Sequence, residues 1–397
     1  MQQVKYPQRP GNKEAKQWEK LIVGLLQRLE LPEDDKQKAI AEYNKLGKWI
    51  GEKLDVPEGG VTIIPQGSMR TQTTIKKPAG KFDIDIVVRL TDGAISKMDP
   101  ENMFKTFGEA LQGREGLTGI PRPKNRCWRL QYEGKPYYFD VTPAVPDATK
   151  SLGSSFRARD KDKGWTPTNP IDFAKWFCDH ADQRFPFQQE SIANDRAAKA
   201  AEIIPIPTKE IGLDDILRRT VQLIKLHRDN MYWFEEERAK ELQPISIILV
   251  TLATHAYSEI LRTRPFEFFS AIDVVQEVVA KMPDYISYDP SSGFPCVWNP
   301  KLLHQENFAD KWHLENGARA KEFMRWHEQL EADISALLHQ SSTDPAPEDI
   351  QKVFGSAGLK AWKESRPSNS GVFKSILTDE NTQPARAVRV GSTTTLG

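Results

Sequence analysis

The stretch Phe82-Asp83-Ile84-Asp85-Ile86-Val87-Val88 decides the fold, because it alternates two carboxylates with apolar side chains. Side chains two residues apart on a β-strand point to the same face of a sheet. Asp83 and Asp85 are therefore expected on one face, while the apolar residues between them point into the core. The sequence predicts a core strand that presents an acidic pair on its other face.

A turn that precedes this strand carries groups suited to an anion. The β-rich run 61–64 is followed, after a proline, by Gln66-Gly67-Ser68. Gly67 permits close approach of the backbone, and Ser68 adds a hydroxyl at the start of a helix expected to run through residue 75. The amides of that first helical turn are expected to point at a phosphate.

A third strand carboxylate, Asp140, lies in the β-rich run 137–141, which can pair beside the first strand. Three carboxylates suit two Mg²⁺ ions, with Mn²⁺ able to substitute, because hard cations prefer carboxylate oxygens. Phosphoryl transfer needs positioning and charge neutralisation, and one carboxylate can accept the proton of the attacking hydroxyl. The set predicts a nucleotidyl-transfer site. The alternative is that Asp83 and Asp85 are solvated strand residues beside an ordinary turn.

Composition narrows the class of protein. The 397 residues are enough for one large or two ordinary domains, and 55 acidic residues balance 55 basic ones. No global field therefore recruits nucleic acid, and no obligatory nucleic-acid partner is expected. We find no apolar run of membrane-spanning length and no signal peptide, which predicts a cytoplasmic protein without a membrane partner. The three cysteines and seven histidines form no ligand cluster, which argues against zinc.

Hydrophobic periodicity predicts an α+β protein in which a mixed sheet with a long N-terminal helix joins a helical lobe. The active site is expected in the cleft between the two lobes. The predicted divisions are a catalytic lobe with N-terminal helices at 1–160, a helical nucleotide-binding lobe at 161–345, a short helical extension at 346–366 and a flexible tail at 367–397. Helices are expected at 18–29, 34–54, 101–111, 213–231, 244–261, 266–282 and 317–339, and a loop at 283–300.

These motifs resemble those of the polymerase-β-like nucleotidyltransferases, and specifically the bacterial cGAS/DncV-like nucleotidyltransferases (CD-NTases). The run 223–229 followed by 244–248 is similar to a helical pair in which a lysine and a serine bind the donor triphosphate, which points to Lys225 and Ser246. The alternatives are a solvated helix lysine for Lys225 and a helix N-cap for Ser246. The resemblance extends to about residue 340.

Two further segments, 164–170 and 306–312, are similar to recurrent stretches of the bacterial enzymes. They contain Trp165 and Trp312, which we expect to pack at the junction of the lobes rather than to stack on a base. One aromatic side chain is still required near the nucleobase. The sequence does not identify which one.

The resemblance implies an enzyme that takes ATP, GTP or pyrimidine triphosphates and makes a cyclic di- or trinucleotide, releasing pyrophosphate. In that interpretation the Gln66-Gly67-Ser68 turn holds the β- and γ-phosphates. Asp83, Asp85 and Asp140 hold the metals, and Asp140 also activates the acceptor 3′ or 2′ hydroxyl. The product is expected to activate a downstream effector in antiphage defence.

The chain ends in small residues and finishes at Gly397. The resemblance implies that a ubiquitin-transfer-like partner can join this glycine to a target, because some bacterial members are activated in that way. The alternative is a frayed end that happens to stop at glycine.

Other functions remain open on the same core. One alternative is an RNA-tailing, CCA-adding or target-modifying nucleotidyltransferase, although the sequence shows no basic track for a polymer. Another is an inactive nucleotide-binding scaffold, which predicts the loss of a carboxylate or of Ser68, and none is lost.

Overall fold

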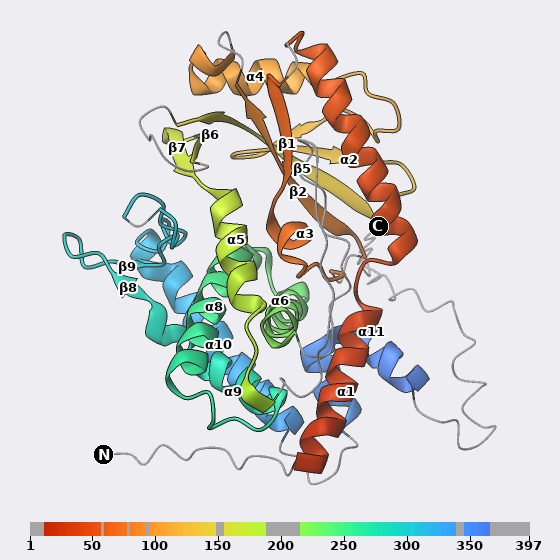
Figure 1. The fold of residues 1–397 in the computed structure, drawn as a ribbon, viewed down its shortest axis with the longest axis vertical. Helices are drawn as coiled ribbons and strands as arrows, with labels where there is room; N and C mark the ends of the chain where they lie inside the picture. The colour runs from red at the N-terminus through yellow and green to blue at the C-terminus, as the bar shows by residue number, and fades with distance from the viewer. Residues whose placement is uncertain are drawn as a thin grey trace, which may run out of the picture.

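The computed structural model describes residues 12–56, 59–77, 80–91, 95–147, 155–187, 215–302, 304–338 and 345–365. These residues form a sheet lobe above a helical lobe (Figure 1). The predicted α+β class, with a mixed sheet and a separate helical lobe, is confirmed. Among the described residues, no helix is both long and apolar enough to cross a membrane.

The sheet lobe contains a seven-stranded sheet with one parallel pair at its centre. Strands β2 and β5 run parallel, and every other pairing in this sheet is antiparallel. The main order is β1-β2-β5-β4-β3, and β6 and β7 extend from β5. The strands are β1 (Val61–Pro65), β2 (Phe82–Leu90), β3 (Arg122–Pro123), β4 (Trp128–Gln131), β5 (Tyr137–Pro146), β6 (Phe156–Asp160) and β7 (Gly164–Thr168).

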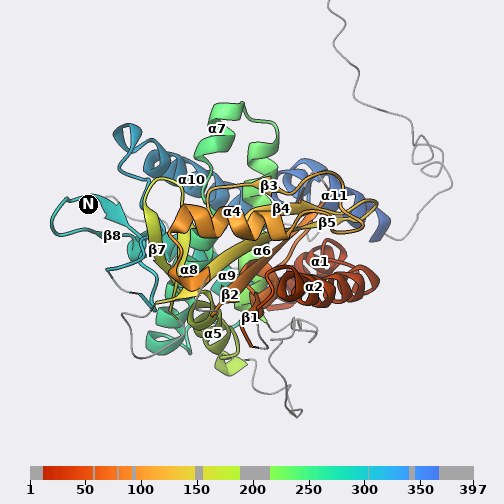
Figure 2. The same cartoon turned by 90° about the horizontal axis from the view of Figure 1, so that it is seen from above.

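Helices cover one face of this sheet. Helix α2 (Glu33–Lys53) and helix α4 (Pro100–Ala110) share a buried apolar cluster with the inward residues of β2 and β5 (Figure 2). Because side chains alternate along a strand, the positions of β2 between these buried residues face the other side of the sheet, toward the helical lobe. Its residues accordingly alternate between buried and half-buried from Phe82 to Ile86. The predicted alternation therefore decides which face of the sheet is left for chemistry.

The helical lobe encloses the larger apolar cluster, which also includes residues from the N-terminal helix. Its helices are α1 (Asn12–Arg28), α5 (Pro170–Ala181), α6 (Ile216–Trp233), α7 (Glu237–Leu242), α8 (Ser246–Thr263), α9 (Ala271–Lys281), α10 (Ala318–Leu338) and α11 (Pro347–Ser365). Short elements complete the fold, namely α3 (Gly67–Thr71), η1 (Ile95–Lys97), η3 (Met282–Tyr285), β8 (Ser287–Tyr288), β9 (Pro295–Cys296) and η4 (Glu315–Gly317).

Three local predictions differ from the structure. The helix after the Gly-Ser turn ends at Thr71 instead of residue 75, because Gln72 adopts a left-handed conformation. Helix α9 begins at Ala271 instead of residue 266, since the Ser270 side chain caps it by accepting a hydrogen bond from the Asp273 amide. The segment predicted as a loop at 283–300 contains a two-stranded hairpin.

The packing also departs from the predicted divisions in two places. Helix α1, assigned by sequence to the catalytic lobe, buries Trp18, Leu25 and Leu26 in the cluster of the helical lobe. The sheet itself continues to Thr168, beyond the predicted boundary at residue 160, because β6 and β7 form one hairpin. The predicted tail at 367–397, with Gly397, lies outside the described residues.

Candidate active site

The Gly-Ser turn lies directly against the acidic strand. The Gln66 amide donates a hydrogen bond of 2.9 Å to the carbonyl of Asp85, which fixes the turn to β2. Gly67 has a φ of +58°, and a Cβ atom there would lie 2.2 Å from Oδ2 of Asp85. Glycine is therefore required for both conformation and space. Ser68 follows at the start of α3, where its Oγ accepts a hydrogen bond from Thr74.

The three predicted carboxylates meet on neighbouring parallel strands. Asp85 of β2 lies opposite Asp140 of β5 in register, and Asp83 lies two residues away on the same face as Asp85. All three side chains are partly buried. Burial, together with the nearby charges of Asp83 and Asp140, raises the pKa of Asp85 to about 7. The negative charges of these three side chains repel one another, and a cation bound between them would reduce that repulsion.

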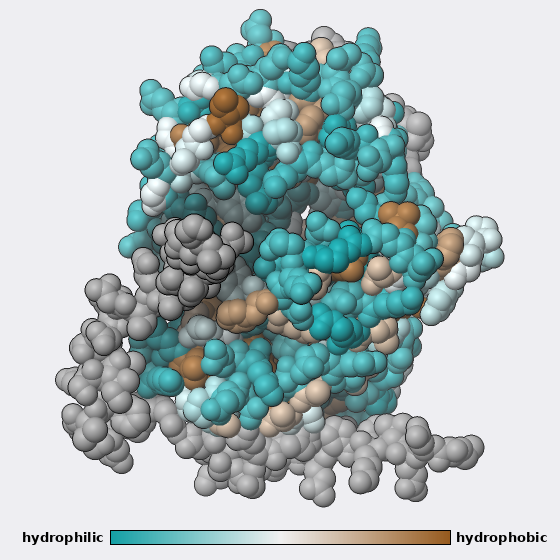
Figure 3. Space-filling model, turned by 180° about the vertical axis from the view of Figure 1, so that it is seen from behind, coloured by the Kyte–Doolittle hydropathy of each residue, from teal (hydrophilic) through white to brown (hydrophobic). Residues whose placement is uncertain are grey.

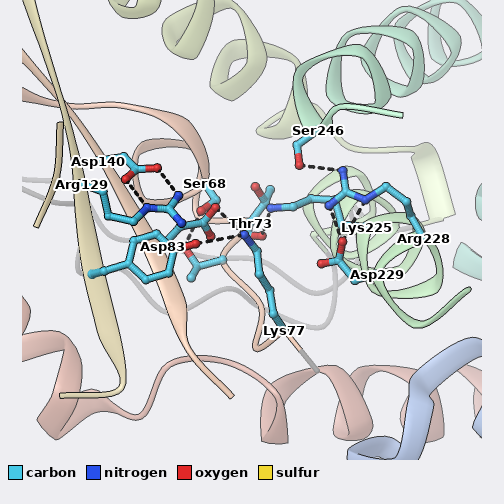
Figure 4. A network of polar contacts seen from close by, with 12 residues as sticks. Ser68, Thr73, Lys77, Asp83, Arg129, Asp140, Lys225, Arg228, Asp229 and Ser246 are labelled. Carbon is cyan, nitrogen blue, oxygen red and sulfur yellow. Dashed lines mark hydrogen bonds and ion pairs between the residues drawn. The ribbon is translucent and has the colours of Figure 1, made fainter. Parts of the chain in front are cut away.

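Two basic side chains of the chain itself already contact this cluster (Figure 4). Lys77 donates to Oδ2 of Asp83 at 2.7 Å. Arg129 on β4 holds both oxygens of Asp140, with distances of 2.8 Å and 2.6 Å, and lies over the Tyr138 ring at 4.0 Å. The sequence interpretation missed both residues. Only the strand register, which sets Arg129 opposite Asp140, identifies the second.

These contacts hold the pKa of Asp83 below its usual range. Burial acts in the opposite direction, but the charges of Lys77 and Lys225 outweigh it. Burial acts to lower the pKa of Lys77, but the combined attractions of Asp83, Tyr138 and Asp229 raise it above its usual value. On the sheet side of the site, the charges of Asp83 and Asp140 are thus compensated by Lys77 and Arg129.

Lys225 points from α6 toward the sheet lobe and is buried, with 8 % of its surface exposed. Its ammonium donates to the carbonyl of Thr73 at 3.0 Å, and burial lowers its pKa to about 8. The alternative of a solvated helix lysine is therefore wrong. The structure instead places a cation next to the segment that links α3 to β2.

Ser246 is the first residue of α8, and the N-cap position is taken by Ile245. The Ser246 hydroxyl accepts a hydrogen bond of 2.9 Å from Arg228, so the capping alternative is not what the structure shows. Arg228 also donates to Asp229 and to the carbonyl of Pro244. This network on the helical lobe holds Ser246 in place (Figure 4).

A cavity of about 570 Å³ brings most of the predicted residues together between the lobes. Its walls come from the sheet lobe, from the start of α5 and α8, from α6 and from the loop before α10. Asp140 and Arg129 lie beside the cavity and not on its wall. The predicted residues that line it are Gln66, Gly67, Ser68, Asp83, Asp85, Lys225 and Ser246.

The aromatic residues on the cavity wall are not the two tryptophans named from the sequence. Phe173 and Phe308 line the cavity and meet edge to face at 5.6 Å. Trp312 is buried in the core of the helical lobe, and Trp165 packs against the core of the sheet lobe. The prediction that both pack is confirmed, but each packs within one lobe and not at the junction.

The donor set agrees with two divalent cations in chemistry and in register. Carboxylate oxygens suit Mg²⁺ or Mn²⁺, and the three aspartates occupy adjacent positions on paired strands. The side chains as they stand are turned toward Lys77 and Arg129. Across the described ranges, no group of three or more His, Cys, Asp or Glu residues is arranged to hold a metal ion in this conformation. Binding of a metal ion by Asp83 and Asp140 would require these two contacts to loosen.

Comparison with known proteins agrees with this architecture. Residues 19–180 match the family described as the Second Messenger Oligonucleotide or Dinucleotide Synthetase domain. A c-di-GMP synthase from Roseivirga ehrenbergii is 32% identical over 280 residues, which is 68% of this chain and 66% of that protein. The matched region is thus just under two thirds of the length of that relative.

Solved structures show the same fold. The CD-NTase CdnG of Bradyrhizobium diazoefficiens, in complex with GTP, matches with a TM-score of 0.64 and 22% identity over 87% of this chain and 97% of that one. CdnC of E. coli MS115-1 with ATP matches with a TM-score of 0.55 and 14% identity over 85% of this chain and 98% of that one.

The two-lobed fold and the acidic strand pair define a nucleotidyltransferase of the polymerase-β type. The matches narrow this class further. The chain is similar to the cGAS/DncV-like nucleotidyltransferases (CD-NTases), the group that its motifs predicted.

Proposed function

We propose that the protein is a metal-dependent nucleotidyltransferase that condenses nucleoside triphosphates into a cyclic di- or trinucleotide and releases pyrophosphate. One observation carries this proposal. The Gly-Ser turn, the acidic strand and the buried Lys225 meet at a single cavity between the lobes. Sequence similarity to a c-di-GMP synthase supports a cyclic product.

The residues of the chain divide the chemistry between the two lobes. Ser68 on the sheet side, with Lys225 and Ser246 on the helical side, binds the donor triphosphate. The acceptor hydroxyl oxygen forms a bond to the α-phosphorus, the bond from that phosphorus to the oxygen leading to the β-phosphate breaks, and pyrophosphate leaves. The proton of the hydroxyl passes to Asp140.

The three aspartates of the sheet lobe would hold the metal ions. Asp83, Asp85 and Asp140 would be the ligands, and Mg²⁺ or Mn²⁺ bound there would supply charge neutralisation and lower the pKa of the attacking hydroxyl. Lys77 and Arg129 then give up their present contacts with two of the three carboxylates. Released from Asp83, the Lys77 ammonium is free to interact with the triphosphate.

We further propose GTP among the substrates. The matched relative is named a c-di-GMP synthase, and the CdnG structure contains GTP, while the CdnC structure contains ATP. The release of the product to an effector in antiphage defence, and the joining of Gly397 to a target by a ubiquitin-transfer-like partner, also remain proposals.

The deciding experiment uses the purified full chain with labelled ATP, GTP, CTP and UTP and with Mg²⁺ or Mn²⁺. Products are treated with phosphatase and identified by mass spectrometry. We expect a phosphatase-resistant cyclic product that contains guanine. If only linear tails on added RNA formed, the alternative of an RNA-tailing enzyme would replace this proposal.

A further inference from the structure

The wall of the cavity contains an arginine, Arg126, that the proposed reaction has not used. Arg126 lies in the turn between β3 and β4, which the hydrogen bond from the Lys124 amide to the Cys127 carbonyl closes. Its side chain lines the main cavity and is 35 % exposed. This places a cationic side chain on the sheet wall of the cavity.

A buried carboxylate fixes the direction of this guanidinium. Asp160, at the end of β6, accepts a hydrogen bond of 3.2 Å from Nε of Arg126. Asp160 is itself buried and held by the Asn125 side chain at 3.0 Å and by the Asp162 amide at 3.1 Å. The side-chain oxygen Oδ1 of Asn125 is also engaged, because it accepts a hydrogen bond from the Lys161 amide. The neighbouring polar groups are thus committed to holding Arg126 rather than to binding a ligand.

The two terminal nitrogens of Arg126 remain available. Within the described part of the chain, neither is recorded in a hydrogen bond, and Nη1 forms only a long ion pair of 3.8 Å with Oε1 of Glu306. Neither terminal nitrogen is among the buried polar atoms that lack a hydrogen-bond partner. A guanidinium anchored through Nε presents these two nitrogens side by side as a planar pair of donors. Such a pair matches two acceptors on a flat ligand.

The position relative to the reacting atoms suits the base of an acceptor nucleotide. Arg126 is three residues before Arg129, which lies opposite Asp140 in the register of β4 and β5. Arg126 also lines the same cavity as Asp83 and Asp85 of β2. Phe308 lines the same cavity and offers a ring on which a base can stack.

We propose that Arg126 reads the guanine base of the acceptor nucleotide through its O6 and N7 atoms, with Asp160 as the residue that positions it. This inference rests on the proposed nucleotidyl transfer. Guanine presents two acceptors on this edge, whereas adenine pairs one acceptor with an amino donor, which a donor-only guanidinium cannot accommodate. Cytosine likewise presents an amino donor. The arrangement therefore favours guanine over adenine and cytosine.

The test compares GTP with two analogues that alter the edges of the base. Inosine triphosphate keeps O6 and N7 but lacks the 2-amino group, and 7-deaza-GTP lacks N7. For the wild type we expect 7-deaza-GTP to be used about 5- to 50-fold less efficiently than GTP, and inosine triphosphate within a few-fold of GTP. Calorimetric binding of the same nucleotides without added metal, where no bond forms, should follow the same order.

Substitutions then assign the effect to the side chain. Arg126→Met should reduce the preference for GTP over 7-deaza-GTP and over ATP to a few-fold. Arg126→Lys keeps the ion pair with Asp160 but lacks the planar pair of donors, and it should lose the same preference with little change in thermal stability. Arg122→Met, an exposed arginine on the same β3–β4 hairpin that does not line the cavity, should keep it.

Two results would overturn the inference. One is a wild type that binds and uses 7-deaza-GTP as well as GTP. The other is an Arg126→Met variant that weakens all triphosphates equally, since this would assign Arg126 to phosphate binding. A wild type that binds GTP in preference to 7-deaza-GTP but forms no cyclic product would refute the proposed function and retain the recognition of guanine.

Discussion

The sheet side and the helical side of the site carry charges of opposite sign. Acidic side chains cluster on the sheet side, and the basic side chains of Lys225 and Arg228 lie on the helical side. On the sheet side, three aspartates are neutralised in part by Lys77 and Arg129, with Asp140 and Arg129 beside the cavity. On the helical wall, Arg228 is neutralised by Asp229, while Lys225 is buried against a carbonyl and bears a lowered pKa. This contrast supports the proposal that the sheet side binds cations and the helical side binds an anion.

Charged groups on each side are paired with groups of the same chain. The proposed metal ions and triphosphate would have to displace these contacts. The back of the molecule is mostly hydrophilic, with hydrophobic residues in small separate patches (Figure 3). The comparison predicts different consequences for substitutions on each wall.

The largest effect is expected from removing the acidic pair. Asp83→Ala combined with Asp85→Ala should lower product formation by at least about 10³-fold, because no carboxylate on β2 remains to hold a cation. Phosphatase-resistant product is the measurement. Asp284→Ala, which removes an exposed carboxylate paired with Lys281, is the matched control and should leave the rate unchanged. Persistence of product in the double variant would show that the metal assignment is wrong.

A smaller loss is expected from crowding the turn. Gly67→Ala should lower activity by about 10²-fold, since its Cβ would collide with the Asp85 carboxylate and move it by a fraction of an ångström. Gly113→Ala is the control for backbone strain, because Gly113 also has a positive φ but has no atom within 4 Å of a Cβ. Equal losses in both variants would mean that strain, and not the contact with Asp85, is the cause.

On the helical side, Lys225→Met should weaken triphosphate binding and raise the free energy of unfolding. Triphosphate affinity should fall about 10-fold or more with the loss of the ammonium. Stability at pH 7 should rise by about 1–2 kcal/mol, since the cost implied by a pKa lowered from 10.5 to about 8 exceeds one lost hydrogen bond. Calorimetry and chemical unfolding measure the two quantities, with the exposed Lys105→Met as control.

The same substitution has a signature in pH. The pKa of Lys225 in the folded protein lies below its unfolded value, so between about pH 8 and 10.5 the unfolded state binds more protons. Stability of the wild type should therefore gain a favourable contribution as the pH rises through this window. The Lys225→Met variant lacks this gain. A stability difference between the two proteins that does not change from pH 7 to pH 10 would contradict the buried, charged lysine.

The smallest effect is expected from removing the Arg129 guanidinium, which contacts Asp140. Arg129→Met should tighten binding of Mn²⁺ in the absence of nucleotide by a few-fold, because the guanidinium no longer competes for Asp140. Titration with Mn²⁺ followed by electron paramagnetic resonance reports this without any turnover. Weaker binding in the variant would instead assign Arg129 to holding Asp140 in its binding position.

Much of the site was predictable because it depends on local patterns. The alternation around Asp83 and Asp85, the glycine of the turn and the apolar faces of the helices follow from residue spacing, and the structure places them as expected. Lys77 and Arg129 were missed because a single basic residue in a loop or strand has no spacing that distinguishes it from a solvated one. Their roles depend on partners 6 and 11 residues away in sequence that the fold brings into contact.

The sequence by itself determined the reaction class, since carboxylate spacing on a strand fixes which side chains share a face. Only the tertiary structure decided that α1 packs with the helical lobe, that Phe308 rather than a tryptophan lines the cavity, and that Arg126 is aimed by Asp160. Spacing along one strand or helix is set by the local backbone. Contacts between distant segments depend on how the lobes pack, which no short stretch of sequence specifies.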